Sequence, residues 1–423
     1  MRRHLSRSVK VALVIACGLL GLSLTACSSP AGSGSASSSG SQSVTVWGPW
    51  TGADQAAVQQ LVDEYNSSQS KYQVVYQYVD QVQQKLLTNE AAKSGIPDAI
   101  MWDRYSTSLY ASKGVLQPLD DLIAQDKVDK SVFYQEALQE LTYQDKTYGL
   151  PLTVDTRVIF YNKTLFTQAG LTPPTTWDQL EQAAIALTQR DASGKLTQSG
   201  FALEDAGLFN VWCLQAGCQL VNSDQTATAF NSPQGLSVLD FWGKLLFTDK
   251  VYDLGWASGS DPFAAGTLAM MYDGPWDIGK YNAVSGLDWG AVPPPTGPTG
   301  DQGAIMGGFG MVIPTGAPNT AGGWDFTKWW TTNTAQGVKF AQLDGWLPGN
   351  QKAMDDPFFQ SDTYKPFVQA LEYAKIRPTV AGYSDVENLV LTPQIQKFMS
   401  GEQDAATTLS TAQSQGDSIL ELG

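Results

Sequence analysis

A strand, a helix and a second strand follow one another within residues 43–79, and this order constrains the fold more than any other feature. Residues 43–47 (SVTVW) and 72–79 (YQVVYQYV) are rich in β-branched and aromatic residues, as strands are. Between them, residues 58–65 place apolar side chains at i, i+3, i+4 and i+7, which predicts a helix with one buried face. A strand, helix and strand in this order form a βαβ unit, which requires a mainly parallel sheet covered by helices. The sequence therefore predicts an α/β fold.

Later parts of the chain carry the same signals. Residues 158–161 (VIFY) form a short apolar run of the kind found in buried parallel strands. Thr176 opens a capping box, and Ser232 followed by Pro233 marks the start of another helix. Residues 292–301 (VPPPTGPTGD) can form neither a helix nor a central strand, so we expect a crossing between domains there. With 423 residues, 43% of them hydrophobic, the chain can bury the cores of about two or three domains.

The first 27 residues are typical of an exported protein. Residues 1–10 carry the positive charges, and residues 11–22 form an apolar stretch that is too short to span a bilayer but suits a signal-peptide core. The run Leu24-Thr25-Ala26-Cys27 resembles a bacterial lipobox, which implies that the signal peptide 1–26 is removed and that Cys27 carries the lipid, such as palmitate. An ordinary secretory signal cleaved nearby is the alternative. The Ser/Gly-rich residues 27–43 then form a tether, and the protein lies at the outer face of the cell membrane, held by its lipid anchor only.

Histidine content and charge exclude several classes of function. The only histidine is His4, within the predicted signal peptide. Without it the chain has no imidazole, which rules out Ser-His-Asp and Cys-His nucleophile systems and the HExxH metal site. The lack of histidine does not exclude a glycosidase, which needs only two carboxylates. The formal net charge of −15 repels phosphate backbones, so we expect no nucleic-acid partner.

Two cysteines remain after Cys17 and Cys27 are assigned to the signal peptide and the lipid. Cys213 and Cys218 lie five positions apart, and in an oxidising compartment two such thiols most simply form a local disulfide. They are too few for a zinc site, which takes four ligands. We therefore expect no metal and no cofactor.

Four segments of the chain resemble one family. Each carries a weak motif, but they occur in the expected order and together span most of the chain that follows the tether. The segments are residues 100–116 (with WDR), 149–187 (with YNK, LF..AG and PP.TW), 263–276 (with F..G..AM and GPW) and 343–350 (LDGWLPGN). They resemble the extracellular solute-binding proteins of ABC importers, specifically the carbohydrate-binding group related to maltose-binding protein.

The resemblance implies a two-lobed periplasmic-binding-protein-like fold of type II, in which each lobe is a mainly parallel sheet flanked by helices. The N-terminal lobe would comprise residues 44–153 and 294–314, and the C-terminal lobe residues 154–293 and 315–423. The chain would cross between lobes near residues 153–156, 292 and 314. Closure around the ligand would be a hinge motion.

The resemblance also implies part of a ligand site. Asp103 and Arg104 match the pair that relatives carry at the cleft; the alternative for them is a surface ion pair, worth under about 1 kcal/mol. Asp155 stands at the first hinge. Trp276, in the GPW run, matches the family's stacking tryptophan, and Trp346 matches the late aromatic segment.

Further candidates come from what a sugar site needs. Sugars are bound by planar aromatic faces and by charged or amide groups that form paired hydrogen bonds. Trp50, or else Trp47, ends the first strand, where open α/β sheets place ligands. Asp80 follows the second strand, Trp256 lies in a loop, and the glycine-rich run 307–310 suggests close approach of backbone to ligand. The predicted ligand-binding residues are therefore Trp50, Asp80, Asp103, Arg104, Asp155, Trp256, Trp276, Gly308, Phe309 and Trp346.

These observations predict a monomeric receptor, not an enzyme, that captures a neutral oligosaccharide and delivers it to the permease of an ABC importer. A binding protein for a glycerol-phosphodiester or another anionic solute is the first alternative, although the chain has few arginines. An extracellular glycosidase that uses two carboxylates is the second.

Overall fold

The computed structural model describes residues 40–421. The predicted signal peptide, the lipidation site Cys27 and most of the tether lie outside these residues. Among the described helices, none is long and apolar enough to cross a membrane.

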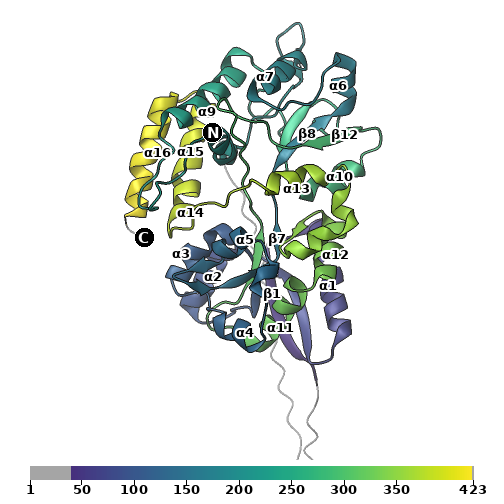
Figure 1. Ribbon diagram of the computed structural model, residues 1–423, viewed down its shortest axis with the longest axis vertical. Coiled ribbons are helices and arrows are strands. Elements are labelled where there is room, and N and C mark those ends of the chain that lie inside the picture. The colour runs from purple at the N-terminus through teal and green to yellow at the C-terminus, as the bar shows by residue number, and fades with distance from the viewer. Residues whose placement is uncertain (1–39, 422–423) are drawn as a thin grey trace, which may run out of the picture. The chain divides into compact units, whose positions relative to one another are not determined.

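The first sheet contains the βαβ unit that the sequence predicts. Its strand order is β2 (Tyr72–Tyr78), β1 (Gln42–Gly48), β3 (Ala99–Asp103), β13 (Phe309–Val312) and β6 (Gly149–Pro151). Strand β1 pairs in parallel with both β2 and β3, whereas β13 runs antiparallel to its two neighbours. Helix α1 (Gly52–Ser68) buries the side chains that recur at helical spacing. Helix α11 (Thr320–Thr331) packs against β1, β3, β6 and β13 (Figure 1). The predicted α/β fold is confirmed.

The second sheet differs from the expected parallel arrangement. Its order is β11 (Met270–Asp273), β8 (Val158–Asn162) and β12 (Trp289–Val292), and both outer strands run antiparallel to β8. The expectation of a mainly parallel sheet in each lobe is therefore wrong for this one. Strand β8 is followed by two helices and finds its partners more than a hundred residues later, so its local sequence carries no signal of their direction.

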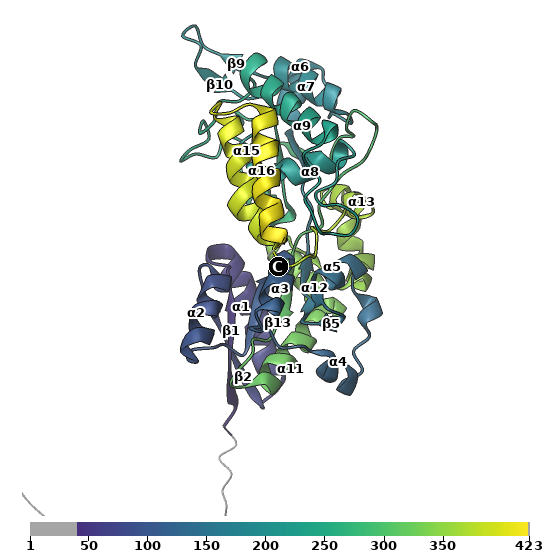
Figure 2. The ribbon, with the colours of Figure 1, turned by 90° about the vertical axis from the view of Figure 1, so that its left-hand side faces the viewer.

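Helices surround the second sheet. They are α6 (Lys163–Ala169), α7 (Trp177–Ala186), α8 (Phe209–Gln215), α9 (Pro233–Gly243), α10 (Ile278–Asn282), α13 (Lys365–Leu371), α15 (Thr392–Met399) and α16 (Ala405–Leu420). Thr176 and Ser232 cap α7 and α9 as predicted, because each side chain accepts a hydrogen bond from a backbone N–H of the first turn. Helices α15 and α16 pack side by side (Figure 2).

Shorter elements complete the chain. They are α2 (Val82–Ala92), α3 (Thr107–Ser112), α4 (Asp120–Gln125), α5 (Gln135–Glu140), α12 (Thr334–Asp344), α14 (Tyr383–Asp385), β4 (Thr142–Tyr143), β5 (Lys146–Thr147), β7 (Thr153–Val154), β9 (Gln189–Arg190), β10 (Leu196–Gln198) and β14 (Leu347–Pro348). A π-helical turn, Val386–Leu391, follows α14.

The chain leaves one sheet for the other at places that differ in part from the expected boundaries. It leaves the first sheet after β6, near residues 153–156 as expected. It returns to the first sheet only at residues 307–309. Before that, Thr296 and Ile305 form isolated β-bridges with Thr176, which caps α7, and with Lys375, which follows α13. After β13, helices α11 and α12 pack on α1 and on the first sheet, so residues 315–344 lie with the first sheet and not with the second. The third crossing follows β14, before α13 packs on β8.

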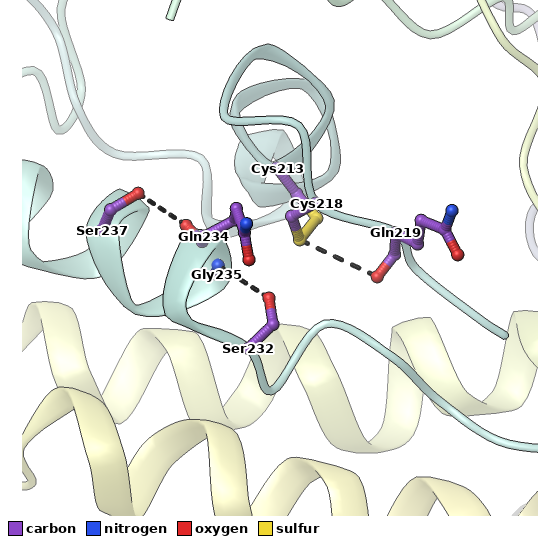
Figure 3. The surroundings of a disulfide bond; sticks show 7 residues. All are labelled: Cys213, Cys218, Gln219, Ser232, Gln234, Gly235 and Ser237. Carbon is purple, nitrogen blue, oxygen red and sulfur yellow. Dashed lines mark hydrogen bonds between the residues drawn. A yellow bond between two sulfur atoms is a disulfide. The ribbon is translucent and has the colours of Figure 1, made fainter. Parts of the chain in front are cut away.

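Cys213 and Cys218 form a disulfide at the end of α8 (Figure 3). The bond joins the last turn of that helix to the segment that follows it, close to the capped start of α9 at Ser232. A loop this short removes little entropy from the unfolded chain, on the order of 2 kcal/mol. The structural effect of the bond is therefore local, and it fixes the end of α8.

Candidate functional site

A cavity of ≈ 240 Å³ lies where the chain crosses between the two sheets. The end of β3, the two crossing segments and the first turn of α8 meet there. Its wall combines charged, amide and aromatic side chains, and it consists of Asp103, Asp155, Arg157, Gly207, Asn210, Val211, Trp276, Ile305, Gly307, Gly308, Phe309, Trp346 and Arg377.

Six of the ten predicted ligand-binding residues lie on this wall. They come from five separate segments, which only the fold brings together. Gly308 has φ +122°, and a Cβ there would lie 2.5 Å from the backbone oxygen of Thr153, so this position requires glycine. The six are Asp103, Asp155, Trp276, Gly308, Phe309 and Trp346.

Trp50 lies behind the wall. Only 6% of its surface is exposed, and its ring packs against those of Phe309 and Trp346 at centroid distances of 4.7 and 5.9 Å. Trp47, the other candidate on this strand, is buried in the core as well. Neither residue lies on the wall of this cavity, because both side chains pack in the core beside the first sheet. Trp50 supports two residues that line the cavity.

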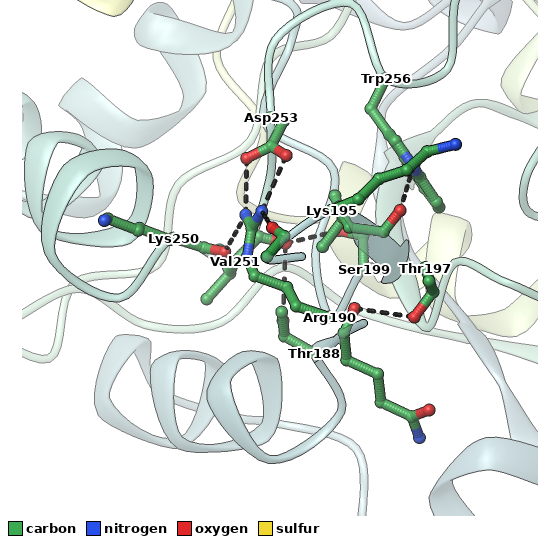
Figure 4. A network of polar contacts seen from close by, with 12 residues as sticks. Thr188, Arg190, Lys195, Thr197, Ser199, Lys250, Val251, Asp253 and Trp256 are labelled. Atoms are coloured by element: carbon green, nitrogen blue, oxygen red, sulfur yellow. Dashed lines mark hydrogen bonds and ion pairs between the residues drawn. The ribbon is translucent and has the colours of Figure 1, made fainter. Parts of the chain in front are cut away.

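Trp256 and Asp80 also lie elsewhere. The indole N–H of Trp256 donates to the backbone oxygen of Leu196 at 3.1 Å, in the same polar network as the Arg190–Asp253 ion pair (Figure 4). Asp80 is exposed just after β2. A loop without periodicity was too weak a signal to place Trp256 in a site.

Arg104 has a structural environment and not the ligand contact expected for it. Its side chain is fully buried, with Nε 3.0 Å from Oε2 of Glu140. The guanidinium also donates to the backbone oxygens of Thr153, Gly307 and Phe309. These oxygens belong to both chain crossings, so Arg104 holds the crossings together behind the cavity. It is neither a surface ion pair nor a residue of the cavity wall.

Three residues that sequence reasoning did not single out contribute polar groups to the wall. Arg157 follows Asp155 by two positions on the first crossing, and Arg377 lies in a loop before α14. Asn210 lies in the apolar run FNVWC, where a polar residue among core residues was the one available signal. Arg377 is held by Glu387 of the π-helical turn, whose Oε1 lies 2.9 Å from Nε, and its guanidinium carbon lies 5.0 Å from the centroid of the Tyr105 ring.

The charges of the wall are unevenly paired. Both guanidinium groups on the wall have a carboxylate partner, with Asp205 at 3.5 Å from Arg157 and Glu387 at 2.9 Å from Arg377. Behind the wall, Glu140 lies 3.0 Å from Arg104. Within residues 40–421, the carboxylates of Asp103 and Asp155 have neither an ion pair nor a hydrogen bond. The site therefore has two carboxylates available to accept hydrogen bonds from a ligand.

Burial raises the pKa of both free carboxylates. The pKa of Asp103 rises to about 6, because burial and the charge of Asp155 outweigh the attraction of Arg377. The pKa of Asp155 also rises, chiefly because of burial, although Arg157 opposes the change. Ionising these buried groups is costly, and hydroxyl donors would offset that cost.

We expect the substitution Asp103→Asn to stabilise the protein in a pH-dependent way. Because the pKa of Asp103 lies above its ordinary value of 3.8, its contribution to stability is largest below pH 4 and is lost as pH rises through 6. At pH 8 the variant should therefore have a free energy of unfolding higher by about 2–3 kcal/mol, and near pH 4 the difference should vanish. Urea unfolding of both proteins at the two pH values measures this. An equal difference at both would contradict it.

Trp276 forms the aromatic part of the wall and is held on several sides. Its ring centroid lies 5.0 Å from that of Trp346, and the guanidinium carbon of Arg157 lies 5.6 Å from it. A Cβ added to Gly274 would lie 2.1 Å from the nearest atom of the Trp276 ring, so the ring rests on a position that only glycine leaves free. The same ring also lines a second cavity of ≈ 700 Å³ together with the end of α12 and with α10.

Comparison with known proteins agrees with a solute-binding architecture. Residues 60–366 match the model of the bacterial extracellular solute-binding protein family. A maltotriose-binding protein of Pyrococcus abyssi is 25% identical over 346 residues, which are 80% of this chain and 74% of that protein. An sn-glycerol-3-phosphate-binding periplasmic protein of Rhizobium meliloti is 24% identical over 88% of this chain and 93% of its own length. The GacH receptor of Streptomyces glaucescens, solved unliganded and with acarbose, superimposes with a TM-score of 0.81 at 25% identity over 90% of this chain and 99% of that one.

Proposed function

Since the chain belongs to the bacterial extracellular solute-binding proteins, we propose that it captures a neutral oligosaccharide outside the cytoplasm and delivers it to the permease of an ABC importer. Like the relatives that it matches, it is a binding protein and not an enzyme. The lipid anchor at Cys27 is part of this proposal and is supported by the lipobox-like run in the sequence. The glycosidase alternative is set aside.

The observation that carries the sugar proposal is the mixture of groups on the cavity wall. The aromatic rings of Trp276, Trp346 and Phe309 offer planar apolar faces for the C–H surface of a sugar. Asp103 and Asp155 can accept hydrogen bonds from hydroxyl groups, and the guanidinium groups can donate to hydroxyl oxygens. The maltotriose-binding relative and the acarbose-binding receptor support the same class of ligand.

The charge balance favours a neutral ligand over an anionic one. An anion would need a guanidinium or a helix N-terminus free to pair with it. Each arginine at the site already has a carboxylate partner, and Asp103 and Asp155 would repel a phosphate. The sn-glycerol-3-phosphate-binding relative is the specific observation that keeps an anionic solute as the second candidate.

A second cavity beside the first favours more than one sugar ring. The first cavity, of ≈ 240 Å³, lies below the typical range for a ligand pocket, about 300–1,000 Å³. Trp276 also lines the second cavity of ≈ 700 Å³, which can take the continuation of a chain bound in the first. We therefore favour an oligosaccharide over a single ring.

A thermal-shift comparison of maltotriose, acarbose and sn-glycerol-3-phosphate with the purified protein tests this function. A ligand at 100 times its dissociation constant should raise the free energy of unfolding by about 2.7 kcal/mol. We expect a shift with at least one of the two sugars. A shift with sn-glycerol-3-phosphate and with neither sugar would overturn the proposal in favour of the anionic solute.

A further inference from the structure

Asn210 is an anomaly on the wall of the first cavity. It lies in the first turn of α8, and only 2% of its surface is exposed. Neither its side-chain nitrogen nor its side-chain oxygen has a hydrogen-bond partner within residues 40–421. Buried polar side chains in folded proteins are nearly always paired, because leaving one unpaired is costly. An amide that is buried, unpaired and on a cavity wall therefore suggests a partner that enters from the cavity.

Gln215, at the other end of the same helix, shows what a structural amide looks like here. Its side-chain oxygen accepts from the indole N–H of Trp177 at 2.8 Å. Its nitrogen donates to Tyr272 Oη at 2.9 Å and to the backbone oxygen of Gly303 at 3.2 Å. Both residues are at least 98% buried, but within residues 40–421 only the amide of Gln215 has hydrogen-bond partners.

The position of Asn210 is fixed by its helix. The disulfide at Cys213 and the hydrogen bonds of Gln215 both hold α8, and Phe209 and Trp212 pack into the core on either side of the amide. Gly207 and Val211, which flank Asn210 on the cavity wall, have no side-chain donor or acceptor to offer it. Asn210 is therefore held at the cavity wall by a rigid support, as a recognition group requires.

We propose that Asn210 is a specificity-determining residue, whose amide oxygen accepts from one hydroxyl group of the bound sugar while its NH2 donates to an adjacent hydroxyl oxygen. The inference rests on the proposed function and extends it, because an amide with one donor side and one acceptor side matches a pair of neighbouring hydroxyl groups. The indole N–H of Trp346, another residue of this wall, is also buried and has no partner within residues 40–421, so it supplies a further donor. A sugar that lacks one hydroxyl of the pair would leave the amide half-satisfied and would be rejected.

The variants Asn210→Leu and Gln215→Met test this, with maltotriose as the probe in a fluorescence titration and with the melting temperature of the unliganded protein as the second readout. Asn210→Leu should weaken maltotriose binding by 30-fold or more while leaving the melting temperature unchanged or higher, because it removes an amide that the fold does not pair. Gln215→Met should do the reverse, with a lower melting temperature and an affinity within about threefold of the wild type.

Two results would overturn the inference. One is maltotriose binding by Asn210→Leu within twofold of the wild type, which would leave the proposed function intact. The other is a lower melting temperature for unliganded Asn210→Leu with unchanged affinity, the signature of a structural amide.

If Asn210→Leu does not fold, Asn210→Asp keeps the shape but loses the donor, and it should weaken binding by at least 10-fold. Binding of sn-glycerol-3-phosphate in place of maltotriose, weakened by the same substitution, would overturn the proposed function but support Asn210 as a recognition group.

Discussion

Replacing Trp276 with alanine should weaken maltotriose binding by roughly 30- to 1,000-fold, the largest loss that we expect from any single change in the cavity. Large aromatic residues at the centre of a binding site typically contribute 2–4 kcal/mol, and each 1.4 kcal/mol corresponds to a factor of ten in affinity. Trp276 qualifies because it lines both cavities and its ring is held by Trp346 and Arg157. A calorimetric titration of the two proteins measures the difference.

Two further variants separate stacking from general damage. Trp329→Ala removes a half-buried tryptophan of α11 that packs on Tyr65 and Phe326 outside the cavity, so it should leave the affinity unchanged. Gly274→Ala keeps the Trp276 ring but displaces it, and it should weaken binding in part. If Trp276→Ala binds maltotriose as tightly as Trp329→Ala does, Trp276 is not part of the sugar site.

Replacing Arg104 with alanine should lower the free energy of unfolding by about 3–5 kcal/mol. The change leaves Glu140 as a buried charge without its partner and also removes the donor to three backbone oxygens of the two crossings. Urea unfolding monitored by circular dichroism measures the loss.

Arg190→Ala is the matched control for this prediction. Arg190 pairs with Asp253 and also donates to the backbone oxygens of Gly194 and Lys250. Unlike those of Arg104, these contacts lie at the surface, where the two side chains are 24% and 49% exposed, so their loss should amount to no more than about 1 kcal/mol. Losses of similar size for the two variants would mean that Arg104 does not hold the crossings. The conservative variant Arg104→Lys keeps the charge but cannot reach all of these oxygens with one planar group, and we expect it to lie between the two.

The parts of the fold that the sequence predicted are those with local signals. Strands β1 and β2 and helix α1 each carry their own periodicity, and the caps at Thr176 and Ser232 are single-residue signals. The antiparallel second sheet depends on strands that meet β8 from more than a hundred residues away. The late return of the chain at residues 307–309 depends on bridges to Thr176 and Lys375 that no local pattern reveals.

For the site too, the residues that could be predicted are those in local motifs. Asp103 and Trp276 could be named because each lies in a short motif, and both line the cavity. Arg104 lies in the same motif as Asp103, but the two neighbouring side chains have different surroundings, and only the packing around Glu140 shows that Arg104 is structural. Arg377 could not be found, because its place in the site is set by Glu387 and not by any pattern near it.

A crystal structure of the protein grown with maltotriose tests the central claim most directly. The account predicts a sugar ring in the first cavity, with hydroxyl groups within hydrogen-bond distance of Asp103 and Asp155 and with a face against Trp276. Maltotriose bound at another surface, or an empty cavity at a maltotriose concentration that saturates binding in solution, would contradict it.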